Sequence, residues 1–330
     1  MCPVSSELTM KWHYPPPPLP LVFLLLLLLV GTASVSGFRI CSYNVQKFNQ
    51  QKSSNYRLIH TLTRVVSRCD ICLLQDVVDA DGKAIKTLLL ALNRETDRYE
   101  GHSYQSLSSK GLGNSPEDLQ QYVFIYRTQM VKVIGQHQYS RKQSFVREPF
   151  VVQFQSNQTA IEKFILVPLH TEPRQAVQEI DRLYDVFQEV SRKWNNTNVM
   201  FLGDFHASCA YVTRTDRKKI RLYKDSNFSW LIGDRVDTTV GKDTNCAYDR
   251  IVVHGEPFLK AIHPFSAKVF DFSKQFKLSR TRVMEVSDHF PLEVTLTLKR
   301  SALLNGSALL LQATPLLVLL STMVWWLPRL

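Results

Sequence analysis

An alternation of short apolar runs with longer amphipathic segments, extending from residue 38 to residue 298, restricts the fold more than any other feature. Apolar residues recur at helical spacing in Tyr56–Val66, Ala84–Leu92 and the longest amphipathic segment, Val177–Trp194. The short runs are typical of strands, and they are Phe38–Asn44, Asp70–Gln75, Tyr122–Tyr126, Val131–Ile134, Phe150–Phe154, Phe164–Leu169, Val199–Leu202, Tyr248–Val253 and Leu292–Leu298. No Gly/Ser-rich linker interrupts the pattern, which predicts one α/β domain of two packed sheets covered by helices.

Composition excludes some protein classes and leaves others open. Hydrophobic residues make up 45% and charged residues 21% of the 330 residues, which is incompatible with overall disorder. The absence of a heptad or longer repeat excludes fibrous and solenoid architectures. The formal charge of +11 favours anionic partners such as nucleic acid or anionic lipid head groups. Solubility alone accounts for such a charge equally well, so the charge does not identify the partner.

The N-terminal 37 residues have the layout of a secretory signal peptide. Lys11 precedes the apolar run Leu19–Val30, and small residues follow it up to Gly37. Val35 and Gly37 fit the −3 and −1 positions of a cleavage site, so we expect a mature chain that starts near Phe38. An uncleaved signal anchor is the weaker alternative, because small residues end the apolar run.

The C-terminal segment, residues 301–330, is typical of a GPI-attachment signal. The small residues Asn305-Gly306-Ser307 and a spacer precede a terminal apolar run, 315–327. A transmembrane helix over Ala308–Leu327 is the alternative, but almost no residues remain for a cytoplasmic tail. We expect an anchor at Asn305 or a neighbour. Together the two ends predict the secretory pathway, with the protein GPI-anchored at the cell surface or secreted.

Cysteines and glycosylation sequons fit an exported protein. Five cysteines follow the leader, and this odd number leaves at least one thiol free or paired between chains. Cys69 and Cys72 fall at a helix end and inside a strand, so we expect buried or partly buried thiols, and the pairing of Cys41, Cys69 and Cys72 stays open. The sequons at Asn157, Asn195 and Asn227 predict glycosylated surface loops.

Polar residues recur immediately after the predicted strands. Ligand-binding groups of α/β folds collect at strand ends, because the backbone is exposed and rigidly held there. Two histidines with several carboxylates at one sheet edge would supply an acid, a base and hard-metal ligands. Each residue alone has an ordinary structural explanation, and their conjunction favours a functional site. The residues are Asn44, Asp76, His170, Asp204 with His206, Asp249, and Asp288 with His289.

Six segments in order resemble the signature segments of the deoxyribonuclease I family. They are Arg147-Glu-Pro-Phe150, Val167-Pro-Leu-His170, Gly203-Asp-Phe-His-Ala207, Asp237-Thr-Thr239, Cys246-Ala-Tyr-Asp-Arg250 and Ser287-Asp-His-Phe-Pro291. Together with the C-terminal signal, they look like the GPI-linked deoxyribonuclease-I-like branch called DNase X. The resemblance implies a catalytic domain over residues 38–300 with the four-layer α/β sandwich of the endonuclease/exonuclease/phosphatase superfamily. It also implies Mg²⁺ and Ca²⁺ dependence and endonuclease activity on double-stranded DNA, and it indicates no obligate protein partner.

The resemblance also assigns roles to individual residues. His289 would pair with Asp249, and His170 would be the second imidazole, so that the two histidines act as general base and general acid. Cys209 and Cys246 match the family's structural disulfide. The implied metal ligands are Asp76, Asn44, Asp204 and Asp288, with His206 at a further ligand position, and the implied DNA-phosphate contacts are Arg147 and Tyr248.

Three residues depart from the family pattern. Asp76 stands where the family has Glu, one methylene shorter. His206 replaces an Asn, and imidazole prefers softer metals than Mg²⁺, which makes Mn²⁺ an alternative. Gln120 replaces the Glu that pairs with the first histidine. We expect Gln120 to keep a hydrogen bond to His170 without its charge, unless Glu117 or Asp118 takes that place.

These departures leave two hypotheses of different classes. The first is an active endonuclease of altered efficiency or metal preference. The second is a catalytically weakened pseudo-nuclease that still binds DNA or another anionic partner. Retention of both histidines and of Asp249, Asp204 and Asp288 favours activity. A lipid or inositol phosphatase is disfavoured by the deoxyribonuclease-specific segments. The basic run Arg214–Arg221 is explained equally well by DNA-phosphate contacts and by a solvated loop.

Overall fold

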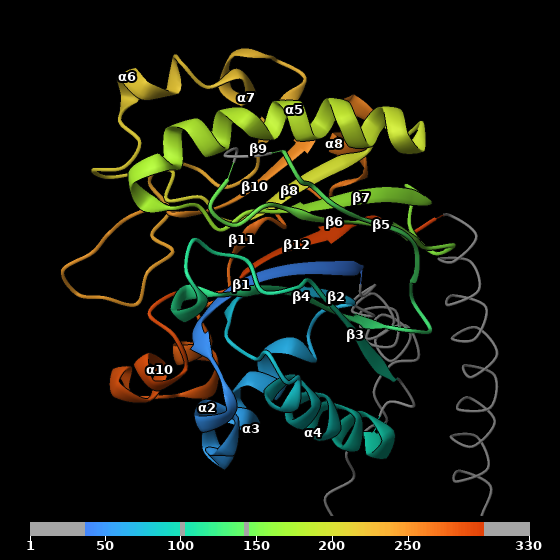
Figure 1. Cartoon of the computed structure of the whole chain (residues 1–330). Coiled ribbons are helices and arrows are strands. Elements are labelled where there is room, and N and C mark those ends of the chain that lie inside the picture. Colours follow the sequence, from blue (N-terminus) through green and yellow to red (C-terminus); the bar gives the residue numbers. More distant parts are fainter. Residues whose placement is uncertain (1–36, 100–102, 142–144, 300–330) are drawn as a thin grey trace, which may run out of the picture. The chain divides into compact units, whose positions relative to one another are not determined.

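The computed structural model describes residues 37–99, 103–141 and 145–299, and these residues form two mixed six-stranded sheets packed face to face (Figure 1). The first sheet has the order β11-β12-β1-β2-β4-β3 and the second the order β5-β6-β7-β8-β10-β9. The first consists of β1 (Phe38–Phe48), β2 (Ile71–Val77), β3 (Tyr104–Ser108), β4 (Gln121–Arg127), β11 (Lys268–Val269) and β12 (Leu292–Leu296). The second consists of β5 (Lys132–Gln138), β6 (Phe150–Gln155), β7 (Lys163–Pro168), β8 (Val199–Asp204), β9 (Phe228–Trp230) and β10 (Asp249–His254).

Each sheet contains a parallel pair of strands at its centre. β1 pairs with β2 and β7 pairs with β8 in parallel, whereas the remaining pairs of both sheets are antiparallel. Parallel neighbours need a crossover connection. The crossover between β1 and β2 contains α2 (Gln50–Ser54) and α3 (Tyr56–Val66), and the other contains α5 (Ala176–Trp194). The carboxyl ends of the parallel strands are therefore free to carry polar residues.

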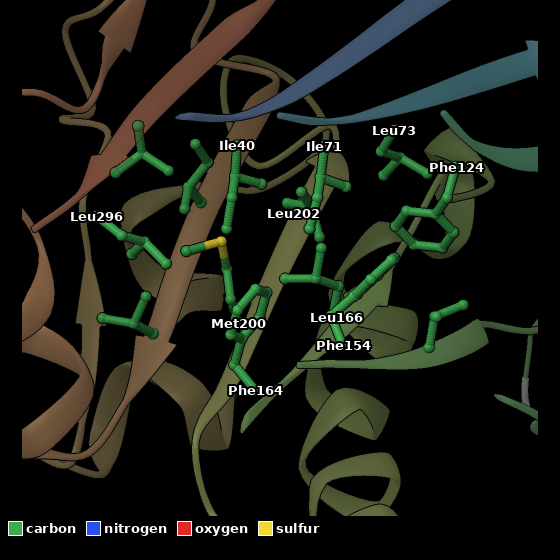
Figure 2. Close-up of a cluster of buried hydrophobic side chains, with 14 of the residues drawn as sticks. Ile40, Ile71, Leu73, Phe124, Phe154, Phe164, Leu166, Met200, Leu202 and Leu296 are labelled. Atoms are coloured by element: carbon green, nitrogen blue, oxygen red, sulfur yellow. The ribbon is translucent and has the colours of Figure 1, made fainter. Parts of the chain in front are cut away.

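The space between the sheets is filled by apolar side chains from both (Figure 2). Ile40, Ile71 and Phe124 come from the first sheet, and Phe164 and Met200 come from the second; each is fully buried. Aromatic edges contribute to this layer, with the Phe124 and Phe154 rings 5.7 Å apart at an interplanar angle of 67°. Burial of one such side chain stabilises the fold by about 1.5–3 kcal/mol.

Helices cover the outer face of each sheet (Figure 1). On the first sheet, α3 places Leu58, Leu62 and Val65 on its buried face, and Asn55 caps its start by accepting from Arg57 N and Leu58 N. On the second, α5 buries Ile180, Leu183, Val186 and Val190 and ends at the left-handed Asn195. The two sheets and two helical layers form the four-layer α/β sandwich that the sequence predicts.

Short elements are the main difference from the sequence prediction. The strands β3, β9 and β11 were not predicted, because segments of two to five residues give too little periodicity to recognise. The same holds for α6 (Arg214–Arg217), α7 (Arg221–Lys224), α8 (Glu256–Ala261), α9 (Phe272–Phe276) and α10 (Arg280–Val286). The helix predicted over Ala84–Leu92 is longer in the structure, as α4 (Lys83–Tyr99).

The cysteine pattern corrects one prediction and agrees with another. Cys41 and Cys69 form a disulfide, so the expectation that Cys69 is a thiol is wrong. Cys69 follows α3 closely enough for its side chain to reach β1, which spacing within the chain does not reveal. Cys209 pairs with Cys246, and Cys72 is the buried free thiol that the odd number requires.

The predicted leader, the C-terminal signal and Asn305 lie outside the described residues. None of the helices in the described part combines the length and the apolar character needed to cross a membrane. The three sequon residues Asn157, Asn195 and Asn227 are exposed at the surface, as their predicted glycosylation requires.

Candidate active site

The polar residues after the predicted strands meet at one edge of the two sheets. Asn44 and Asp76 lie near the carboxyl ends of the parallel pair in the first sheet. His170 follows β7 and Asp204 ends β8, so the carboxyl ends of the parallel pair in the second sheet also face the site. Antiparallel strands contribute their starting ends instead. Asp249 begins β10 directly opposite Asp204.

Asp204 is the centre of the site. Its carboxylate is 1% exposed, and its Oδ2 atom lies 3.7 Å from Nε2 of His170 and 3.6 Å from Nε2 of His289. The side-chain nitrogen of Asn44 donates to the same oxygen at 3.0 Å. Burial disfavours the ionised form, but the surrounding imidazoles outweigh it and lower the pKa of Asp204. The site therefore holds a negative charge within reach of two imidazole nitrogens.

The ring of His289 is held by a buried carboxylate. Its Nδ1 lies 2.7 Å from Oδ2 of Asp249, and its backbone N–H donates to the hydroxyl of Ser287. Burial by itself would lower the pKa of His289, but Asp249 and Asp204 raise it to about 10. The ring is thus oriented from Nδ1, charged at neutral pH and directed at Asp204 through Nε2. This is the pairing that the sequence predicts.

The ring of His170 has different surroundings. Its Nδ1 is buried and forms no hydrogen bond, and Oε1 of Gln120 is buried and unpartnered in the same way. The expected hydrogen bond from Gln120 to His170 is therefore absent, although both residues line one crevice that is too narrow to admit a water molecule. Burial lowers the pKa of His170, and the charge of Arg147 adds to the shift while Asp204 opposes it. His170 is the neutral imidazole of the pair.

His206 brings a third imidazole into the same site. Its Nδ1 lies 3.2 Å from Oδ1 of Asp204 and 3.1 Å from the hydroxyl of Thr171. The ring stacks nearly parallel to that of His170, with centroids 6.0 Å apart, and it contacts the rings of Tyr211 and Tyr248. The backbone of His206 has a φ of 46°, an uncommon conformation for a residue other than glycine. The turn after β8 thus directs an imidazole back onto Asp204.

The remaining candidate metal ligands offer hard oxygen atoms. Asp76 is 9% exposed, and its Oδ1 has no hydrogen-bond partner, which is unusual for a buried carboxylate. Burial raises the pKa of Asp76, and the nearby charge of Asp288 adds to the rise, whereas Lys47 opposes it. Asp204, Asp249 and His289 each offer one ligand atom within 4.8 Å of the others. Those three residues are the acid–base group of the site rather than the predicted ligand set, whereas the unpaired oxygen of Asp76 fits a hard divalent cation.

The two predicted DNA-phosphate residues are both present near the site, in different states. Tyr248 packs against His206 and Tyr211 and is partly exposed. Arg147 is buried, and its Nε and Nη2 donate to the backbone carbonyls of His170 and Thr171. These two bonds use one N–H of Nε and one of Nη2, so a bidentate phosphate contact would fall to the remaining N–H groups of Nη1 and Nη2.

One residue that the sequence analysis missed joins the two sheets beneath the site. The side chain of Gln75 donates from Nε2 to Leu169 O at 2.7 Å and accepts from Asp204 N at 3.0 Å. Gly203 makes room for it, because a Cβ there would lie 2.4 Å from Gln75 Nε2, and its φ of 139° suits glycine alone. A polar residue inside a fully buried strand was the available signal.

Comparisons with known proteins agree with this geometry. Residues 41–289 match the model of the Endonuclease/Exonuclease/phosphatase family. Human deoxyribonuclease gamma is 42% identical over 81% of this chain and 88% of its own length. Human deoxyribonuclease-1-like 1 is 41% identical over 80% of this chain and 86% of its own length. Mouse deoxyribonuclease-1-like 2 is 41% identical over 81% of this chain and 94% of its own length. These near-equal identities do not distinguish branches.

Solved structures extend the likeness of the fold. A humanised zebrafish TDP2 superimposes with a TM-score of 0.55 at 14% identity, covering 79% of this chain and 99% of that one. The human Nocturnin catalytic domain superimposes with a TM-score of 0.54 at 15% identity, covering 80% of this chain and 95% of that one. From its sequence relatives, its family match and its sandwich of two mixed sheets, the chain belongs to the deoxyribonuclease I family within the endonuclease/exonuclease/phosphatase superfamily.

Proposed function

We propose that this protein is a metal-dependent endonuclease that hydrolyses phosphodiester bonds of double-stranded DNA by histidine acid–base catalysis. The observation that carries the proposal is the pair of imidazoles at Asp204, with Nε2 of His170 and Nε2 of His289 at 3.7 and 3.6 Å from one carboxylate oxygen. Its relatives named deoxyribonuclease support DNA as the substrate.

The two histidines have the complementary protonation states that hydrolysis requires. A neutral His170 can accept a proton and a charged His289 can donate one, and each transfer contributes about 10²–10⁴-fold to the rate. Asp249 stabilises the charged form of His289 and orients the ring so that its Nε2–H would face the reacting phosphate. Asp204 holds both rings at the place where the substrate phosphate would lie.

A divalent cation would be held by Asp76, Asp204 and Asp288, with Asn44 beside them. Such a cation neutralises the charge that develops on the phosphate. Mg²⁺ with Ca²⁺ is the proposed combination, and Mn²⁺ is the alternative because His206 adds an imidazole to the site. Tyr248 and Arg147 would contact the DNA phosphates.

The proposed cellular setting follows from the ends of the chain. Residues 1–37 would direct the protein into the secretory pathway, and residues 301–330 would attach it to the cell surface through GPI or a membrane anchor. Residues 38–300 would be the catalytic domain. Two disulfides and three exposed sequons among the described residues support an extracellular location.

Nicking of supercoiled plasmid by the full-length chain, expressed through the secretory pathway of cultured cells, tests the proposal. We expect nicking in Mg²⁺ plus Ca²⁺ that EDTA abolishes and that the His170→Ala, His289→Ala double variant lacks. The matched control is His60→Ala, because His60 is an exposed histidine of α3 that stacks on Tyr56. This variant should nick DNA at the wild-type rate.

Three other outcomes would change the proposal. Nicking in Mn²⁺ alone would assign the altered metal preference to His206. DNA binding without nicking in any metal would replace the enzyme by the pseudo-nuclease. Phosphate release from inositol lipids without plasmid nicking would move the chain to the phosphatases of the superfamily.

A further inference from the structure

A buried carboxylate outside the acid–base pair connects the two segments that surround His170. Glu179 lies on α5 and is completely buried. Its Oε1 accepts from the backbone N–H of Val146 at 2.9 Å, and its Oε2 accepts from that of Glu172 at 3.0 Å. Burial raises the pKa of Glu179 to about 7, although both N–H donors and Arg147 oppose the rise. Burying this charge is costly unless both oxygens are engaged, as they are here.

The two segments held by Glu179 are joined again by Arg147. Val146 immediately precedes Arg147, and Glu172 immediately follows Thr171. Arg147 donates from Nε to His170 O at 3.0 Å and from Nη2 to Thr171 O at 2.9 Å. The hydrogen bonds therefore run in a closed circuit from Glu179 through Arg147 and the backbone of residues 170–172 back to Glu179.

Tyr122 closes the remaining side of this circuit. Its hydroxyl donates to Arg147 O at 3.1 Å and accepts from the backbone N–H of His170 at 2.9 Å. The backbone N–H of Thr171 donates to Asp204 O at 3.0 Å. Both backbone polar groups of His170 are thus fixed, whereas its ring Nδ1 has no partner. In this site the orientation of the His170 imidazole depends on its backbone and on packing.

We propose that Glu179 is a positioning residue for His170, acting through Arg147 and the backbone of residues 170–172. A carboxylate bound to the ring, that of Asp249, orients His289. His170 has no such carboxylate on its ring, and Glu179 orients it through the backbone instead. The inference about catalytic rate rests on the proposed endonuclease function, whereas the inference about the orientation of the His170 ring does not.

Glu179→Gln is the test with the smallest change in shape. The amide keeps one acceptor oxygen but directs its NH₂ group at one of the two backbone N–H donors, so one segment is released. We expect kcat for plasmid nicking to fall about 10–100-fold, because a displacement near 1 Å of a reacting group has an effect of this size. The KM for DNA should stay within about twofold, since no exposed cation is changed.

Glu189→Gln is the matched control on the same helix. Glu189 contacts His137 at 2.8 Å, and its side chain is 29% exposed, so the same substitution breaks an interaction remote from His170. We expect its kcat and KM to equal those of the wild type. Tyr122→Phe is the second variant and removes only the hydroxyl; it should lower kcat in the same direction at unchanged KM. It also keeps the proposal testable if Glu179→Gln does not fold.

Histidine-ring NMR of the ¹⁵N-labelled full chain separates this inference from the proposed function. Glu179→Gln should shift and broaden the ring signals of His170 and leave those of His289 in place, whether or not the protein cleaves DNA. A wild type without nuclease activity would overturn the proposed function, and the ring signals would still decide the role of Glu179. Unchanged His170 signals and unchanged kcat in a Glu179→Gln variant that only melts earlier would overturn the positioning role.

Discussion

His289 and His170 approach the same carboxylate oxygen of Asp204 but are held in opposite ways. His289 is fixed through its ring, because Asp249 accepts at Nδ1. His170 is fixed through its backbone, because Tyr122 and Arg147 bind its N–H and its carbonyl while Nδ1 stays unpaired. A carboxylate on the ring favours the charged imidazole, and burial without one favours the neutral imidazole. Two identical side chains thus acquire complementary proton-transfer roles from the groups that hold them.

Removal of either ring is expected to have the largest effect. His289→Ala and His170→Ala should each lower the nicking rate about 10²–10⁴-fold, because each deletes one proton-transfer group. The double variant should be little worse than the poorer single variant, since the two rings serve one step. Initial rates of plasmid nicking measure this. A His170→Ala variant with more than half the wild-type rate would mean that the two rings are not partners.

Substitution of the residues beside each ring, Asp249 and Gln120, is expected to have the next largest effect, and the two losses of activity should differ sharply. Asp249→Asn should lower kcat about 10²-fold or more, because the amide no longer stabilises the charged form of His289. Gln120→Leu should change kcat less than about threefold, because Oε1 of Gln120 makes no hydrogen bond to lose. Equal losses in the two variants would show that His170 also depends on a ring partner.

Addition of the missing carboxylate should make the two histidines alike. Gln120→Glu places a negative charge in the narrow crevice beside His170 and raises the pKa of that ring. Activity that requires neutral His170 should then fall off at a higher pH, by about one unit on the acid side of the kcat profile. An acid limb in the same position as in the wild type would show that His170 does not need to be neutral.

Stability should depend on pH with opposite signs for the two rings. The pKa of His289 is raised to about 10, so its pair with Asp249 stabilises the fold fully below the unfolded value near 6.5 and loses that effect as pH rises through 10. The pKa of His170 is lowered, so its contribution is present above about 6.5 and is lost as pH falls through the folded pKa.

Thermal unfolding of paired variants measures this difference. Between pH 7 and pH 10, the Tm of the wild type should fall relative to that of the double variant Asp249→Asn, His289→Asn. Between pH 7 and pH 5, it should fall relative to that of His170→Asn. A change of about 2–4 °C is expected per kcal/mol for a domain of about this size. Slopes of the same sign would contradict the contrast.

The disulfides should have the smallest effect on activity. Cys209–Cys246 closes a loop of 37 positions and links the segments that carry Asp204 and Asp249, whereas Cys41–Cys69 closes 28. Loops of these lengths each contribute roughly 3–4 kcal/mol in the chain-entropy model. Serine replacement of Cys209 and Cys246 should lower kcat a few-fold at 25 °C. Serine replacement of Cys41 and Cys69 should leave kcat unchanged. Chemical denaturation should show similar losses of stability for both pairs.

The basic run Arg214–Arg221 illustrates how tertiary contacts assign charges that the sequence leaves open. Arg217 pairs with Asp234, Lys219 pairs with Asp216, and Arg221 binds both Asp181 and Asp185 of α5. Arg217 and Arg221 thus fasten α6 and α7 to their surroundings, whereas the Lys219 pair is local to α6, and these contacts favour the structural explanation for this part of the run. The acidic partners of Arg217 and Arg221 lie 17 to 40 positions away in the chain, so local sequence could not reveal them.

Much of the site could be predicted because strand ends are recognisable in a sequence. His170 and Asp204 stand at the carboxyl ends of β7 and β8, Asp249 and His289 stand at or just before the starts of β10 and β12, and the sheets bring these strand termini together. Glu179 could not be found in this way, because a lone carboxylate on an amphipathic helix looks like part of the solvated face. Only the packing of α5 shows that this position is completely buried.

The sequence by itself determined the α/β class, the two sheets and the identity of the groups that meet at their edge, because periodicity and strand ends are local properties of the chain. The tertiary structure alone decided that Cys41 pairs with Cys69, that Gln120 leaves His170 without a ring partner and that Arg147 binds the backbone at His170. These outcomes depend on differences of a few tenths of an ångström in the distances between residues far apart in the chain, and hydrogen bonds form or fail within such differences.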